Sequence, residues 1–453
     1  MDPRHCLHRE GRALRRIAGL LLAGAVLVPG AATAQVGAPT PAVVGAAAVV
    51  PAAGAAAEIT LPAARALRIT VLAQGLATPG AGSATVSVAT GVGAVARRTT
   101  FSLGQVPASV VMDFDLPHGV ISVGGRRVGS FAPVAPLTDN LKFPVDVAIH
   151  RGTSTVTTHR DITLLLPTVI IPGFANERRS RPDQLVVKRL AQFGYTDAGD
   201  LPTLFWFPYD SRVVGLEDGA RALAAYVRNV VLPATYAAKI NVVGYSVGGL
   251  FARWNIAYDV DGWAGLVNRL VMVAVPNEGA LMPYLGEHAP SFMPFVGSAR
   301  TPLARAMDPV FPFWRATASQ PWSLPADDGN LVLTALNTRP IPAGIRVYNF
   351  YCDNDPSRTG GPQTAAGVTG QLPGATVSYG PGDGVVLTAS ALGLPINGSP
   401  GAPGLVERAV RVDVGRVYHV HVLEAAATKV AEALQDRFET AAEAAGTPQR
   451  AQP

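Results

Sequence analysis

One short stretch of this 453-residue sequence has the residue types and spacing of a serine nucleophile. The stretch Gly244-Tyr245-Ser246-Val247-Gly248 fits the pattern Gly-x-Ser-x-Gly. A serine on a sharp turn between strand and helix brings its neighbours two residues away close together, and glycine at both places avoids a clash. A β-branched run over 240–243 precedes the motif, and an apolar helical stripe from Leu250 follows it. This context predicts a nucleophilic Ser246; a glycine-rich turn with an idle serine is the alternative.

A nucleophilic serine needs a base, and the histidines after Ser246 are His288, His419 and His421. In one known order of the triad, the serine comes first, then the acid, then the histidine. The histidine is then expected on a loop just ahead of the closing helix, which disfavours His288. We prefer His419, because the residues three and four positions beyond it are apolar and can begin to bury a helix. A glutamate lies three positions beyond His421, which stays the alternative base.

The acid has more than one candidate. Asp383 lies between two glycines, and the open backbone of such a turn lets a carboxylate reach an imidazole. Its charge would select the tautomer of the base and stabilise the imidazolium. Asp353 and Asp355, at the end of a predicted strand over 345–351, are the rivals. The residues alone leave this choice open, since an ordinary Asp-Gly turn also fits Asp383.

Strand and helix patterns alternate in the part of the chain that must position these residues. Buried strands are predicted over 164–171, 240–243, 270–275 and 345–351. Helices are predicted over 215–231, from Leu250 onward and over 423–438. Such alternation is typical of a mostly parallel sheet with helices on both faces. We therefore predict an α/β domain over 163–445, followed by a tail at 446–453.

Five motifs in this segment occur together and in one order. They are Ile170-Ile171-Pro172-Gly173-Phe174, Phe193-Gly194-Tyr195, Phe207-Pro208-Tyr209-Asp210-Ser211-Arg212, Gly244-Tyr245-Ser246-Val247-Gly248-Gly249 and Gly382-Asp383-Gly384-Val385-Val386. Over residues 164–440 the chain resembles the lecithin:cholesterol acyltransferase family of α/β-hydrolase lipases and esterases. It departs from the family's pattern at three positions. Ser211 replaces a tryptophan, Val385 replaces a threonine, and Tyr245 lies where the Gly-x-Ser-x-Gly turn, called the nucleophile elbow, often has histidine.

The resemblance implies an α/β-hydrolase fold and roles for particular groups. Asp383 would be the acid, and the backbone N–H groups of Phe174 and Val247 would form the oxyanion hole. The substrate would be a carboxylic ester, with a lipid favoured. An aromatic- and proline-rich insertion over 281–325 would suit a lid over an acyl-chain pocket; its alternative is a buried insertion packed on the core.

The region before the α/β domain has a different pattern. Residues 35–57 are rich in alanine, proline, valine and glycine and are interpreted as a linker. Residues 58–162 contain short β-branched runs separated by glycine, proline and serine turns, which predicts a small all-β sandwich. No catalytic pattern occurs in it. It is interpreted as a spacer or packing module, or else as a module that binds a surface or polymer.

The first 34 residues have the three parts of a secretory signal peptide. Five arginines precede an apolar run over 17–28, and small residues over 29–34 suit cleavage after Ala34. Twelve apolar residues span only about 18 Å as a helix, which is short of a membrane anchor. The protein is therefore predicted to be secreted, to the cell envelope or beyond. Cleavage would remove Cys6 and leave Cys352 without a partner for an intramolecular disulfide.

Composition narrows the class of protein further. Hydrophobic residues make up 48% of the sequence and charged residues 15%, which excludes an intrinsically disordered chain. More than half of the net charge of +5 lies in the first 34 residues, so nucleic acid is not an expected partner. No Gly-x-Gly-x-x-Gly follows a strand, and the acidic stretch over 353–357 lacks the glycine and glutamate of a calcium loop. No cofactor and no metal are predicted.

These observations together predict a secreted serine ester hydrolase of the lipase or esterase type. It would act on lipid-type carboxylic esters through an acyl-serine intermediate, with phospholipase or acyltransferase activity included in the prediction. The alternative is a non-catalytic surface-binding or adhesion protein that keeps the hydrolase fold.

Overall fold

The computed structural model describes residues 56–437 with thirteen gaps, which are 61–65, 73–82, 91–96, 106–108, 152–153, 175–184, 198–201, 212, 281–329, 355–368, 373–374, 379–380 and 397–400. The predicted signal peptide 1–34, the insertion 281–325 and the tail 446–453 lie outside the described residues. So does the predicted linker 35–57 up to residue 55. Within the described residues, no helix is long and apolar enough to cross a membrane.

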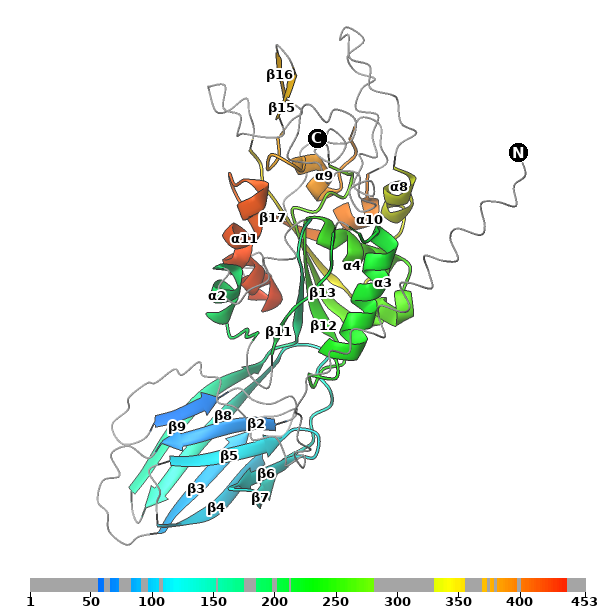
Figure 1. The fold of residues 1–453 in the computed structure, drawn as a ribbon. Coiled ribbons are helices and arrows are strands. Elements are labelled where there is room, and N and C mark those ends of the chain that lie inside the picture. The colour runs from blue at the N-terminus through cyan, green and yellow to red at the C-terminus, as the bar shows by residue number, and fades with distance from the viewer. Residues whose placement is uncertain are drawn as a thin grey trace, which may run out of the picture. The chain divides into compact units, whose positions relative to one another are not determined.

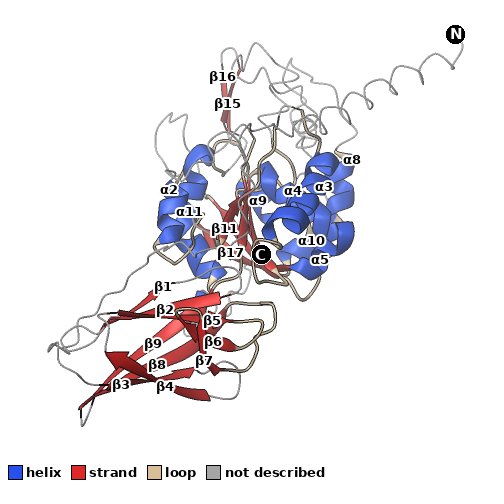
Figure 2. Cartoon of the chain, turned by 60° about the horizontal axis from the view of Figure 1, so that its bottom comes forward, coloured by secondary structure: helices blue, strands red, loops and turns tan. Residues whose placement is uncertain are grey.

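The N-terminal part of the described chain consists of two antiparallel sheets (Figure 2). One has the order β1-β2-β5-β6-β7 and is formed by Ala56–Thr60, Ala66–Leu72, Ser109–Asp115, Val120–Val123 and Arg126–Ser130. The other has the order β4-β3-β8-β9 and is formed by β3 (Ser83–Thr90), β4 (Arg97–Gln105), β8 (Leu141–Arg151) and β9 (Ser154–Leu164). The described residues of this region contain strands and turns, as its β-branched runs suggest. That the two sheets form a separate sandwich over 58–162 stays a prediction.

A six-stranded sheet lies at the centre of the rest of the chain. Its order is β11-β10-β12-β13-β14-β17, and every neighbouring pair is parallel. The strands are β10 (Thr168–Ile171), β11 (Leu204–Trp206), β12 (Ile240–Tyr245), β13 (Val267–Val273), β14 (Arg346–Tyr351) and β17 (Ala409–Asp413). Every residue of β10, β12 and β13 is buried, which explains their nearly continuous apolar runs.

Helices cover both faces of this sheet (Figure 1). One face packs against α3 (Leu216–Tyr226), α4 (Val247–Ala257), α5 (Trp263–Leu266), α8 (Leu331–Asn337) and α10 (Pro403–Val406). The other packs against α2 (Leu185–Ala191) and α11 (His419–Leu434). Two short elements, the hairpin β15 (Thr369–Leu372) with β16 (Ala375–Ser378) and helix α9 (Thr388–Leu392), lie between β14 and β17 in the sequence. The parallel sheet, its helical layers and the strand–turn–helix at Ser246 constitute the predicted α/β-hydrolase fold.

Several predicted boundaries differ from the structure, and three of them bear on the domains or the site. The strand predicted over 164–171 is two strands, because Leu164 ends β9 and Pro167, which has no N–H to donate, precedes β10. Strand β1 begins at Ala56, inside the predicted linker. The closing helix, predicted from residue 423, begins at His419, so the preferred histidine is its first residue rather than part of a loop.

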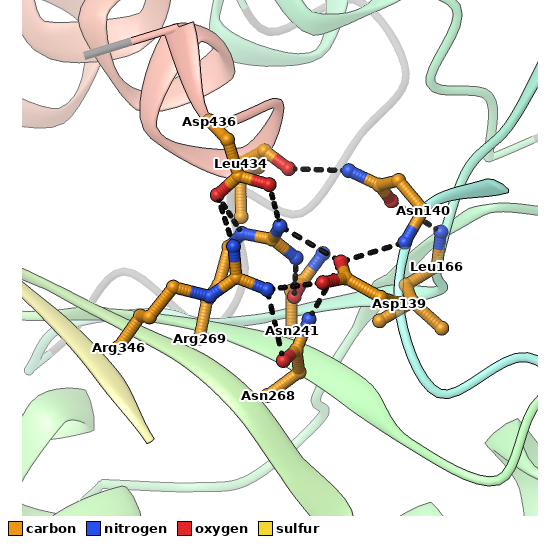
Figure 3. Close-up of polar contacts among 9 residues, drawn as sticks. All are labelled: Asp139, Asn140, Leu166, Asn241, Asn268, Arg269, Arg346, Leu434 and Asp436. Atoms are coloured by element: carbon orange, nitrogen blue, oxygen red, sulfur yellow. Dashed lines mark hydrogen bonds and ion pairs between the residues drawn. The ribbon is translucent and has the colours of Figure 1, made fainter. Parts of the chain in front are cut away.

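The segment that joins β7 to β8 contacts the α/β part of the chain. Leu137 forms a bridge with Ala237 just before β12, and the Asn140 side chain donates to the carbonyl of Leu434 at 2.8 Å. The carboxylate of Asp139 meets Arg269 and Arg346, which lie opposite each other at the amino ends of β13 and β14 (Figure 3). Residues 137–140 therefore pack with the α/β part of the chain, although the sequence placed them in the β region.

Candidate active site

Ser246 lies on a strained turn directly after β12. Its φ is 53° and its ψ is −131°, a backbone conformation that non-glycine residues rarely adopt. A Cβ atom at Gly248 would lie 2.4 Å from the carbonyl oxygen of Ile171, and one at Gly244 would lie 2.4 Å from the Cα of Gly249. Both distances are too short for a side chain, so the turn requires glycine at both places. Helix α4 starts at Val247, directly after the serine.

Three polar side chains from separate elements form a hydrogen-bonded chain at this turn. The Nε2 atom of His419 lies 2.9 Å from Oγ of Ser246, and its Nδ1 atom lies 2.7 Å from Oδ2 of Asp383. All three residues are buried, with exposed fractions of 5% for Ser246, 2% for Asp383 and 8% for His419. The spacing of hydroxyl, imidazole and carboxylate allows the imidazole to take the hydroxyl proton while the carboxylate orients the ring.

Asp383 is held by the turn that carries it. Its Oδ1 atom accepts from the N–H groups of Val385 and Val386 at 3.0 Å and 2.7 Å, which leaves Oδ2 for the histidine. Gly384 has a φ of 91°, in the left-handed region that favours glycine. The backbone N–H of His419 donates to the carbonyl of Asp383 at 2.8 Å. The Asp-Gly turn therefore does not compete with a contact to the imidazole, because the same turn presents the carboxylate of Asp383 to His419.

The alternative residues lie elsewhere. The side chain of His421 is exposed on α11, two positions beyond His419 and on another face of the helix. Asp353 is half-buried after β14, and its rival Asp355 lies outside the described residues, as does His288. Of the predicted candidates, the structure brings together Ser246, His419 and Asp383.

The two residues predicted for the oxyanion hole lie in segments next to Ser246. Val247 is the first residue of α4, where backbone N–H groups have no partner within the helix. Phe174 follows Gly173, and a Cβ atom at Gly173 would lie 2.9 Å from the Cβ of Ser246, so this loop passes directly against the elbow. The hydroxyl of Tyr209 donates to the carbonyl of Pro172 at 2.8 Å and holds the start of the loop. Both N–H groups thus belong to backbone that is packed around Ser246.

A buried polar network anchors the helix that follows Ser246. Arg253 on α4 donates to the side-chain oxygens of Asn277 at 2.8 Å and Asn337 at 2.9 Å. Burial lowers the pKa of Arg253 to about 10, and the negative charge of the buried Glu278 partly offsets that effect. Sequence reasoning did not identify these residues. The available indication was an arginine between two apolar residues of the stripe on the helix predicted from Leu250.

Cys352 is a buried thiol whose pKa is affected by Asp383. It is buried at the end of β14, and burial together with the negative charge of Asp383 raises its pKa to about 12. A thiol with so high a pKa holds its proton at neutral pH, and the protonated form is a weak nucleophile. Within the described part of the chain, no group of three or more histidine, cysteine, aspartate or glutamate residues could hold a metal ion.

The chain is similar to several solved structures at low sequence identity. No protein-family model and no curated protein sequence matches the chain. The mature form of the Bacillus licheniformis lipase BlEst2 is 12% identical, with a TM-score of 0.40, over 59% of this chain and 90% of the lipase. An esterase of Pyrobaculum calidifontis is 13% identical, with a TM-score of 0.34, over 67% of this chain and 87% of the esterase. Carboxyl esterase 2 of Tuber melanosporum is 13% identical, with a TM-score of 0.31, over 69% and 90%. Such distant similarity carries no argument about chemistry, which depends here on the geometry of the site.

Proposed function

We propose that this protein is a serine ester hydrolase of the lipase or esterase type that works through an acyl-serine intermediate. The observation that carries the proposal is the hydrogen-bonded chain from Ser246 Oγ through His419 to Asp383, with distances of 2.9 Å and 2.7 Å. A buried serine on a strained turn, bonded to an imidazole that a carboxylate orients, is the arrangement of an activated nucleophile.

Acylation follows from these positions. As Ser246 Oγ attacks the ester carbonyl carbon, its proton passes to Nε2 of His419, and the carboxylate of Asp383 stabilises the imidazolium. The carbonyl oxygen becomes an oxyanion that accepts hydrogen bonds from the N–H groups of Phe174 and Val247. The carbon–oxygen bond to the alcohol then breaks, and His419 returns the proton to the departing alkoxide. An acyl-serine and a free alcohol result.

Deacylation repeats these steps with a new acceptor. His419 takes a proton from water, the hydroxide attacks the acyl carbon, and Ser246 leaves with the proton that His419 returns. An alcohol in place of water would give acyl transfer with the same residues. Lipid-type esters are the proposed substrates. This part of the proposal rests on the resemblance to the lecithin:cholesterol acyltransferase family and on the apolar insertion 281–325.

A fluorophosphonate probe tests the proposal against the alternative of a non-catalytic binding protein. We expect the probe to label Ser246 and the purified protein to hydrolyse p-nitrophenyl esters, with Ser246→Ala losing both properties. Esters of short and long acyl chains, presented in solution and in micelles, would then measure the preference for lipids. A chain that folds correctly but neither reacts with the probe nor hydrolyses any ester would favour the binding protein.

The proposed location is outside the cytoplasm. It rests on the three-part N-terminal pattern over 1–34. N-terminal sequencing of the protein from the producing cells should start at Gln35, and a protein that retains Met1 would contradict export with cleavage. The β region is proposed as a spacer or as a module that binds a surface or polymer.

A further inference from the structure

The residue that precedes the nucleophile makes contacts that the triad does not account for. Tyr245 is the last residue of β12 and is 3% exposed. Its ring is stacked on the imidazole of His419, with the ring centroids 5.3 Å apart and the planes inclined by 27°. Its hydroxyl donates a hydrogen bond to the backbone carbonyl of His419. One side chain therefore contacts both the ring and the backbone of the histidine.

His419 needs such contacts because of where it lies. It is the first residue of α11, and the first turn of a helix lacks the backbone N–H bonds that hold the helix interior. Its own N–H donates instead to the carbonyl of Asp383 at 2.8 Å. The hydroxyl of Tyr245 donates to the carbonyl of His419. The backbone of His419 is thus anchored on both sides by groups from outside the helix.

The ring of Tyr245 also borders the loop that leads to Phe174. A Cβ atom at Gly173 would lie 3.0 Å from both Cδ1 and Cε1 of Tyr245. The loop therefore passes the edge of the ring without room for a side chain. One ring is therefore packed against both the imidazole and the loop that carries a proposed oxyanion donor.

We propose that Tyr245 is a positioning residue that keeps Nε2 of His419 within hydrogen-bonding distance of Ser246 Oγ. The hydroxyl holds the backbone of His419, and the stacked ring limits the tilt of the imidazole. Tyr245 itself neither gives nor takes a proton in the reaction. The proposal rests on the proposed function, because a fixed distance between base and nucleophile matters only if proton transfer occurs.

The test compares Tyr245→Phe, which keeps the ring and removes the hydroxyl, with Tyr245→Leu, which removes both. We expect Tyr245→Phe to lower kcat about tenfold with KM within twofold of wild type, because small displacements of reacting groups reduce rates by up to about 10²-fold. Tyr245→Leu should lower kcat further. The rate of fluorophosphonate labelling should fall in parallel with kcat.

Tyr236→Phe is the matched control. The Tyr236 hydroxyl also donates to a backbone carbonyl, that of Val134 at 2.6 Å, but in the segment between β7 and β8. Its removal should leave kcat, KM and labelling unchanged. A proton NMR signal from Nδ1–H of His419, in its bond to Asp383, gives a readout that needs no turnover. It should broaden in Tyr245→Phe and stay sharp in Tyr236→Phe.

Two results would overturn the proposal while leaving the proposed function intact. One is a folded Tyr245→Phe with wild-type kcat and an unchanged His419 signal. The other is a variant with raised KM and unchanged kcat, which would assign Tyr245 to substrate contact. If Tyr245→Phe is unstable, assays well below its unfolding temperature and the NMR signal still decide the matter. A wild-type protein without labelling or hydrolysis would contradict the proposed function itself.

Discussion

Polar groups lie at both ends of the parallel strands and are organised in opposite ways. The carboxyl ends of the strands form the carboxyl edge of the sheet, and the amino ends form its amino edge. At the carboxyl edge, one serine, one histidine and one aspartate form a linear chain that ends in a hydroxyl. At the amino edge, Arg269 and Arg346 each bind both Asp139 and Asp436, so four charges form a closed ring (Figure 3). A linear chain leaves a hydroxyl at its end without a second carboxylate or imidazole in the chain, whereas in a closed ring each charge faces two of opposite sign.

Electrostatics explain why the ring at the amino edge is structural. The side chain of Arg269 is fully buried, so its charge needs the two carboxylates that face it. Burial by itself would raise the pKa of Asp139, but the charge and hydrogen bond of Arg269, with bonds from the Asn140 N–H and Arg346, lower it below the usual 3.8. Asp139 comes from the segment between β7 and β8, so the ring joins that segment to the sheet and to the end of α11. These charges stabilise the assembled chain.

Among changes at the carboxyl edge, removal of the Ser246 hydroxyl, the proposed nucleophile, should have the largest effect. Ser246→Ala should lower kcat for ester hydrolysis by about 10⁶-fold, because nucleophile, base and acid act as a unit. The fold should persist, with an unchanged thermal unfolding transition. Ser130→Ala, in the exposed part of β7, is the control and should keep full activity. Activity of Ser246→Ala within tenfold of wild type would contradict the whole assignment of the site.

The two histidines at the start of α11 should differ sharply. His419→Ala should reduce hydrolysis about as much as the serine substitution, because the imidazole is bonded to both Ser246 and Asp383. His421→Ala should be mild, since that side chain is exposed. Steady-state kinetics of both variants with one soluble ester decides the point. The reverse result would move the base two residues along the chain.

The acid is expected to have the next largest effect. Asp383→Asn preserves shape but removes the charge that selects the tautomer of His419, so kcat should fall by about 10⁴-fold. Asp355→Asn serves as the comparison and should lose far less. Measurement of both variants against the same ester separates the candidates. A large loss at Asp355 with a small loss at Asp383 would refute the choice of Asp383.

The amino edge should affect stability instead of catalysis. Asp139→Asn removes one of the two charges that face the buried Arg269, so the free energy of unfolding should fall by about 1–3 kcal/mol. At temperatures where the variant is folded, kcat should stay within twofold of wild type. Glu217→Gln is the control, because it breaks an ion pair with Arg221 that is exposed to solvent and contributes little to stability. Urea denaturation measures both variants.

The contribution of Asp139 to the free energy of unfolding should depend on pH in a predictable direction. Because the folded-state pKa of Asp139 is lowered, its contribution to stability is fully present above the ordinary value of 3.8 and is lost as pH falls through the folded-state value. The difference in unfolding free energy between wild type and Asp139→Asn should therefore be constant near neutral pH and shrink in acid. A difference that grows as pH falls below 3.8 would have the wrong sign. Deletion of residues 36–160 also removes Asp139. Because the buried Arg269 then loses one of its two carboxylate partners, the free energy of unfolding of the remaining chain should fall.

Local features of the sequence were sufficient to predict several parts of the structure. The apolar runs of the central strands and the alternation of strand with helix indicate the parallel sheet, because strands covered on both faces carry few polar residues. At the elbow only Gly244 meets a local steric demand, because a Cβ there would lie against Gly249, whereas Gly248 makes room for the carbonyl of Ile171, which is distant in the sequence. The choice between His419 and His421 followed from helical periodicity, and the structure points the two side chains in different directions.

The remaining features depend on contacts between residues far apart in the sequence. The residues alone left Asp383, Asp353 and Asp355 open, because only the folded chain shows which carboxylate reaches the imidazole 36 positions further on. Asp139 reads as an ordinary polar residue of the β region until folding places it beside Arg269, 130 positions away. Tyr245 was visible only as a departure from a motif, and its stacking on His419 requires β12 and α11 to be packed together. Short-range sterics and hydrophobic periodicity are encoded locally, whereas the partner of each charge and ring is decided by how the elements pack.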